Sequence, residues 1–63
     1  MNIEPIAKTA MEFLKENIPS VCLGTTRNIG EIFEVEWESH LTGGKGSVFV
    51  TVDNPRVVGF KKT

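Results

Sequence analysis

Hydrophobic and polar positions along this chain follow two different periods, and the change falls at Pro19. Before it, apolar side chains recur at steps of three and four, which is typical of one face of an α-helix. That face consists of Ile3, Ile6, Ala7, Ala10, Met11, Leu14 and Ile18, and Phe13 widens it. Asn2 is the expected N-cap, and Pro19 cannot continue a helix. We therefore predict a helix over residues 3–17.

After Pro19 the alternation has a period of two, which is typical of β-strands. The predicted strands are residues 21–26, 31–41, 47–53 and 57–61, and turn residues separate them at 28–30, 42–46 and 53–56. Gly24 interrupts the first strand, so we expect a bulge or close backbone packing there. Connections this short favour pairing between sequential strands, which makes an antiparallel meander.

One face of the predicted sheet is apolar. Its side chains are Phe33, Val35, Trp37, Leu41, Val48, Val50, Val52, Val58 and Phe60. An apolar face has to be covered, and within this chain the only candidate cover is the apolar stripe of the helix. The predicted fold class is therefore α+β, with the N-terminal amphipathic helix packed on one face of a four-stranded antiparallel meander. Residues 1–63 form a single small domain.

This arrangement resembles the cystatin-like group of small folds, and its local pattern is similar to PepSY-type domains. The resemblance rests on the strands Phe33-Glu34-Val35-Glu36-Trp37, Val48-Phe49-Val50-Thr51-Val52-Asp53 and Val57-Val58-Gly59-Phe60. It departs from PepSY domains at Asn54-Pro55-Arg56, where they usually hold a glycine. A PepSY-type domain implies a non-catalytic binding or inhibitory module. The pattern is also similar to small gas-vesicle accessory proteins, which implies a component of a larger assembly. Neither resemblance supplies a catalytic residue.

Composition narrows the function classes. A chain of 63 residues with 40% hydrophobic and 24% charged residues is typical of a small globular domain and not of a disordered one. The net charge of −1 argues against a nucleic-acid partner, which usually meets a basic surface. The chain holds no run of the ~20 apolar residues that a membrane-spanning helix needs. The N-terminal residues lack signal-peptide features and Cys22 is the only cysteine, so we expect a cytoplasmic protein.

The outer face of the sheet carries the clearest candidate site. Alternation places Glu34, Glu36 and Glu38 in a line, each about 7 Å from the next. A line does not converge on one ion, so we predict no metal site. Phe49 shares this face, with Ile32 and Val57 expected near it, and exposed apolar groups there favour a contact surface. The predicted partner-binding residues are Glu34, Glu36, Glu38 and Phe49. The alternative is a solvated face whose carboxylates pair with Lys or Arg of neighbouring strands.

The sequence offers one candidate pair of residues for catalysis. Cys22 and His40 are the only candidate nucleophile and base, but Cys22 is expected to be buried between Val21 and Leu23, and no third residue orients the imidazole. The segment 43–47 fails as a phosphate loop because a strand follows it instead of a helix. We therefore predict a protein that is not an enzyme, with no catalytic residue and no cofactor.

The resulting functional prediction is a small non-enzymatic protein-interaction module that uses its outer sheet face or a sheet edge. One alternative is an inhibitor or regulator that adds its edge to a partner enzyme. Another is an accessory component of a larger assembly. The expected partner is a different protein or a second copy of this chain. A homodimer would cover the same face or edge.

Overall fold

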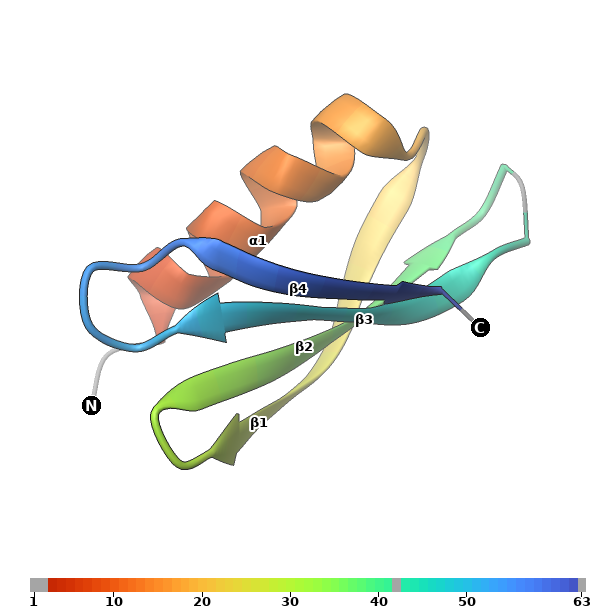
Figure 1. Cartoon of the computed structure of the whole chain (residues 1–63). Coiled ribbons are helices and arrows are strands. Elements are labelled where there is room, and N and C mark those ends of the chain that lie inside the picture. Colours follow the sequence, from red (N-terminus) through yellow and green to blue (C-terminus); the bar gives the residue numbers. More distant parts are fainter. Residues whose placement is uncertain (1–2, 42, 63) are drawn as a thin grey trace.

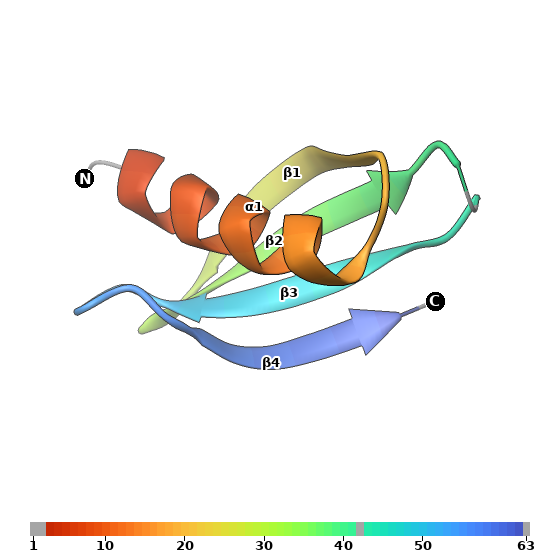
Figure 2. The same cartoon turned by 90° about the horizontal axis from the view of Figure 1, so that it is seen from above.

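A computed structural model describes residues 3–41 and 43–62. The elements are one helix, α1 (Glu4–Asn17), and four strands, β1 (Val21–Ile29), β2 (Ile32–Ser39), β3 (Lys45–Thr51) and β4 (Val57–Lys62). The strands lie in the order β1-β2-β3-β4, each antiparallel to its neighbour, and α1 crosses one face of the sheet (Figures 1 and 2). The predicted α+β fold, one helix on a four-stranded meander, is confirmed.

The helix buries the centre of its predicted stripe. Ile6, Ala10 and Leu14 are buried, and the small side chain of Ala10 lets the helix axis approach the sheet closely. Pro5 lies in the first turn, where its missing N–H removes no helical hydrogen bond. Ile3 belongs to the predicted stripe but is 48% exposed, because the helix begins only at the next residue. The predicted cap, Asn2, lies outside the described residues.

The core lies between α1 and the inner sheet face, the face toward the helix. Its sheet residues are Phe33, Val35, Trp37, Val48 and Val50, as predicted. Val52 packs against this core from one side. Leu41 was expected on the same face but is 70% exposed, because β2 ends at Ser39 and the alternation of the strand ends with it.

The last strand departs from simple alternation. Phe49 of β3 pairs with Gly59, but the next residue, Val50, pairs with Val57, so Val58 is an extra residue in β4. Because of this bulge, the residues that precede it in β4 face the opposite side of the sheet from the one that simple alternation predicts. Val57, expected near the outer face, therefore packs against the core, and Val58, expected in the core, is 48% exposed. Both predictions were wrong for the same reason.

A second bulge lies in the first strand. Leu23 pairs with Trp37 and Thr26 with Val35, which leaves Gly24 and Thr25 together opposite Glu36. The bulge predicted at Gly24 is confirmed. The central pair β2–β3 is continuous, from Ile32 opposite Thr51 to Glu38 opposite Lys45. The two irregularities therefore lie on the two edge strands.

The connections differ in detail from the predicted turns. Gly30, with a φ of 70°, makes a two-residue turn between β1 and β2. The β2–β3 connection covers residues 40–44, in which Gly43 has a φ of 74° and Thr42 lies outside the described residues. Gly46 was assigned to that loop but lies inside β3. Within the described ranges, no helix is long and apolar enough to cross a membrane.

Candidate interaction surface on the outer sheet face

Strand pairing arranges the outer face, the side of the sheet away from α1, in three rows that cross the strands. Each row holds one of the predicted carboxylates at its centre. The rows are Arg27–Glu34–Phe49–Gly59, the bulge–Glu36–Ser47–Lys61, and Cys22–Glu38–Lys45. The three glutamates share one face, as the alternation predicts, but their neighbours differ.

Glu34 is already bound within the chain. Its Oε1 atom lies 2.5 Å from Nη2 of Arg27, and its side chain is only 13% exposed. The hydrogen bond from Arg27 lowers the pKa of Glu34 most, and the Ser47 hydroxyl and the charge of Lys61 add to the lowering, against an opposing effect of burial. The solvated alternative, a carboxylate paired across strands, therefore describes Glu34. This residue is not available as a free contact.

Phe49 is half-buried because its ring covers part of the sheet itself. A Cβ atom built at Gly59, its partner on β4, would lie 3.1 Å from Cδ2 of Phe49. The ring therefore lies against the bare backbone of Gly59, where an aromatic residue replaces the missing side-chain packing. Ile32, on the neighbouring strand, is half-buried as well. Phe49 therefore lies on the predicted surface, but its ring is already packed against the sheet.

Glu36 and Glu38 differ from Glu34 in their exposure and in their contacts. Both are exposed, and neither forms an ion pair within the part of the chain that the structure describes. Lys45 is the register partner of Glu38, while Ser47 is the register partner of Glu36. Of the four residues predicted to bind a partner, these two carboxylates are the ones that remain open to an outside group.

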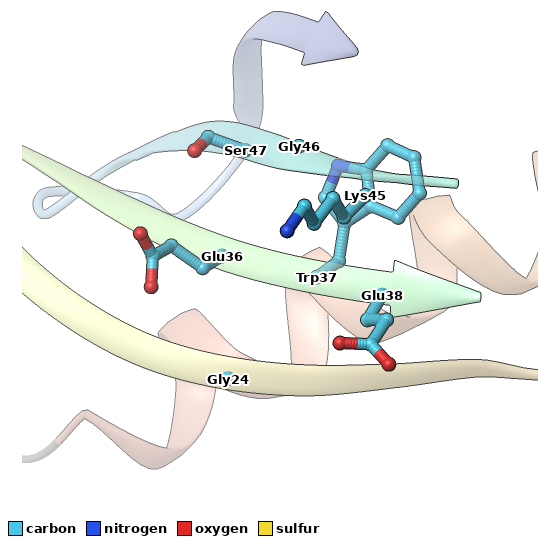
Figure 3. A pocket seen from close by; sticks show the side chains of 7 residues that line it. All are labelled: Gly24, Glu36, Trp37, Glu38, Lys45, Gly46 and Ser47. Atoms are coloured by element: carbon cyan, nitrogen blue, oxygen red, sulfur yellow. The ribbon is translucent and has the colours of Figure 1, made fainter. Parts of the chain in front are cut away.

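A depression opens beside these two carboxylates. It is lined by Gly24, Glu36, Trp37, Glu38, Lys45, Gly46 and Ser47 and has a volume of about 340 Å³ (Figure 3). Figure 3 shows the two carboxylate groups on either side of Gly24, with Lys45 reaching in from β3. The cause is local: Gly24, in the bulge of β1, lies opposite Glu36 and has no side chain. The outer face is therefore hollow at this point, and Gly46, which pairs with Trp37 in an inner-face row, contributes backbone to the lining.

The two glycines are not equivalent. A Cβ at Gly24 would meet the nearest atom, Cβ of Glu36, at 3.6 Å, which is an ordinary contact. A Cβ at Gly46 would lie 2.0 Å from the backbone oxygen of Lys61. Gly46 is therefore required by the close approach of β4, whereas Gly24 leaves space that an alanine would partly fill.

Cys22 and His40 both belong to the end of the sheet where β1 begins and β2 ends. Cys22 is exposed, which contradicts the predicted burial, because Val21 and Leu23 on either side of it turn toward the core. His40 is exposed too, and its backbone N–H donates to the Ser20 carbonyl at 3.1 Å. Among residues 3–41 and 43–62, no group of three or more His, Cys, Asp or Glu side chains is arranged to hold a metal ion.

The geometry thus defines a small α+β domain with a hollowed outer face that carries both carboxylates and cations. Comparisons with family models, with curated proteins and with solved structures found no match. The resemblance to cystatin-like, PepSY-type and gas-vesicle accessory domains stays a prediction. Sequence reasoning missed the depression, although its signal is present as Gly24, because locating it requires the pairing of the β1 bulge with Glu36.

Proposed function

We propose that this chain is a small non-enzymatic protein-interaction domain, and that the centre of its contact surface is Glu36 and Glu38. One observation carries the proposal: two exposed carboxylates, which form no ion pair within the described residues, stand on either side of a depression. The remaining predicted residues have supporting roles, since Arg27 holds Glu34 and the ring of Phe49 covers Gly59. A cytoplasmic location belongs to the same proposal and rests on the single thiol.

The chemistry of the surface indicates a basic partner segment. The two carboxylates are spaced about 7 Å along β2, so one lysine or arginine side chain can enter the depression between them. Exposed ion pairs contribute only about 0–1 kcal/mol each, so charge supplies orientation more than affinity. Contact with the apolar part of Phe49 would add to the binding. A modest affinity that weakens with salt is the expected behaviour.

The structure favours the face over the sheet edges as the contact region. Adding a strand to an edge requires a run of regular backbone donors and acceptors. Both edge strands are interrupted by a bulge, β1 at Gly24–Thr25 and β4 at Val58. A partner strand would therefore pair over only part of either edge. Regulation of an enzyme by edge addition is for this reason the second candidate.

A second copy of the chain is an alternative occupant of the outer face. Lys45 and Lys61 lie in the same rows as Glu38 and Glu36, so two copies could place cations of one against carboxylates of the other. Such a dimer predicts a melting temperature that rises with protein concentration. A role as an accessory component of an assembly would use the same surface toward a different protein.

The test compares two double charge reversals of equal net charge. Glu36→Lys/Glu38→Lys changes the proposed surface, while Glu12→Lys/Glu16→Lys changes exposed positions on α1. Each variant is titrated with a lysine-rich peptide and followed by backbone amide NMR signals. Saturable shifts centred on residues 24, 36, 38 and 47 that only the first variant loses support the proposal. Shifts spread evenly over the chain, or equal binding by both variants, contradict it.

A further inference from the structure

The inner side of the sheet holds a polar group without a partner. Trp37 is 3% exposed, and its indole Nε1 is the one buried side-chain nitrogen or oxygen, within the described residues, that makes no hydrogen bond. A buried donor left without an acceptor lowers the stability of the fold. The remaining core is apolar and well packed, so this position stands out from its surroundings.

A pocket lies directly beside this indole. It is lined by Asn17, Ile18, Trp37, Phe60 and Lys62 and has a volume of about 280 Å³. It forms where α1 ends, because β4 continues beyond the part of the sheet that the helix covers (Figure 2). The ring of Phe60 stacks on Trp37 with centroids 5.6 Å apart and an interplanar angle of 13°, and it is 43% exposed.

The strand register fixes the space between the indole and Lys62. Trp37 pairs with Gly46, and Gly46 pairs with Lys62, so the three residues form one row across β2, β3 and β4. Figure 3 shows the indole beside Gly46 with its nitrogen on the side of β3. Since a Cβ at Gly46 would collide with the Lys61 backbone, no side chain can occupy the middle of this row.

The lining has the chemistry of an anion site with apolar walls. Lys62 supplies a positive charge, the indole supplies a donor, and the lining residues that the structure describes include no Asp or Glu. The carbonyls at the end of α1 carry partial negative charge and oppose an anion, so the charge of Lys62 has to outweigh them. One of these carbonyls, that of Leu14, accepts a hydrogen bond from the Ile18 N–H at 2.7 Å.

We propose that this pocket binds a small apolar carboxylate. The carboxylate accepts a hydrogen bond from Nε1 of Trp37 and pairs with the ammonium of Lys62, while the apolar part lies against Phe60 and Ile18. The volume is at the lower limit of small-ligand pockets, about 300–1,000 Å³, so one ring or a short branched chain fits and a folded segment does not.

Access to the nitrogen requires a side chain at the rim to move. The candidates are Phe60 and Lys62, which are both exposed and both on the edge strand β4. A change of rotamer there disturbs no strand pairing. The site lies on the opposite side of the sheet from Glu36 and Glu38, so it is independent of the proposed protein-binding function.

The experiment uses the full chain and its single tryptophan. Because Trp37 is the only tryptophan, the protein gives one indole N–H signal in NMR. Phenylacetate is titrated against this signal, with phenylacetamide and phenethylamine as neutral and cationic analogues of the same ring. We expect a saturable downfield shift with phenylacetate only. Lys62→Gln should weaken this binding about two- to fivefold, the range of an exposed ion pair, and Lys61→Gln, on the outer face, should leave it unchanged.

Three results would overturn the proposal. The first is no saturable shift of the indole signal with phenylacetate. The second is an equal response to the amide or the amine, which would show that the carboxylate is not recognised. The third is an equal loss of phenylacetate binding in Lys61→Gln and Lys62→Gln. This would show that only the overall positive charge of the protein matters and not the position of Lys62.

Discussion

Arg27 of β1 and Glu34 of β2 are register partners, and the guanidinium Nη2 of the first lies 2.5 Å from Oε1 of the second. This pair separates the three glutamates of the outer face into one that is bound within the chain and two that are open. The same contact makes the stability of the fold depend on pH.

The pKa of Glu34 is lowered from its ordinary value of 4.5, chiefly by the hydrogen bond from Arg27. A carboxyl group with a lowered folded-state pKa stabilises the fold above its unfolded-state value and loses this contribution as the pH falls through the folded-state value. We therefore expect the free energy of unfolding to fall below about pH 4.5, and to fall less in Arg27→Gln. Urea unfolding of both proteins between pH 7 and pH 3 measures this difference. Parallel curves would show that the pair contributes nothing to the pH dependence.

The two glycines of the depression should respond differently to alanine. Gly46→Ala forces a backbone collision between β3 and β4, so we expect a loss of about 1–3 kcal/mol in unfolding free energy. Gly24→Ala makes only an ordinary contact with Glu36 and should lie within about 0.5 kcal/mol of the unaltered protein. Denaturant unfolding measures both. Equal effects at the two positions would contradict the register of β4 on β3.

Gly24 also allows a test of the depression itself. Gly24→Leu places a larger side chain beside Glu36 and leaves the charge of the surface unchanged. If a lysine side chain enters there, this variant should bind the lysine-rich peptide at least about tenfold more weakly, since a filled site costs more than one exposed ion pair. Gly24→Ala is the matched control and should lose less. Unchanged binding by Gly24→Leu would move the contact away from the depression.

The bulge in β4 predicts different costs for two neighbouring valines. Val57 packs against the core, so Val57→Ala should lower the free energy of unfolding by about 1 kcal/mol. Val58 is 48% exposed, so Val58→Ala should change it by less than about 0.5 kcal/mol. Simple alternation of the strand predicts the reverse order. Thermal or urea unfolding of the two variants therefore distinguishes the bulged strand from a regular one.

Cys22 offers a chemical test of the β1 register. Because the thiol is exposed, a water-soluble thiol reagent should modify it fully in the folded protein, at a rate close to that of the unfolded chain. The reaction is followed by mass spectrometry with and without denaturant. Protection in the folded state would show that Cys22, and not Val21 and Leu23, faces the core.

The sequence was sufficient for the helix, the order of the strands and most of the core, because both periodicities are strong. The prediction from the sequence was wrong where one extra residue changes the alternation of a strand. Nothing in Val57-Val58 indicates an extra residue in β4, since either valine suits a buried position. Leu41 and Cys22 were misplaced for related reasons: the first depends on where β2 ends, and the second on which of three β-prone residues turn inward.

Locating the candidate site required the pairing of neighbouring strands, which the alternation along one strand does not give. Alternation alone placed Glu34, Glu36, Glu38 and Phe49 on one face. The removal of Glu34 from the open surface depends on Arg27 being its partner, which follows from the length of the turn at Gly30. That Gly46 and Lys62 lie in the same row as Trp37 also follows only from the strand register.

The two bulges have a consequence for the behaviour of concentrated solutions. Fibrils grow when regular, exposed edge strands of successive molecules join into one continuous sheet. Here the regular, uninterrupted ladder is the internal pair β2–β3, while each outward edge is broken after a few residues and β4 ends in two lysines. A chain with about half of its residues in one sheet therefore presents no long template to its neighbours, and we expect it to remain free of fibrils while it is folded.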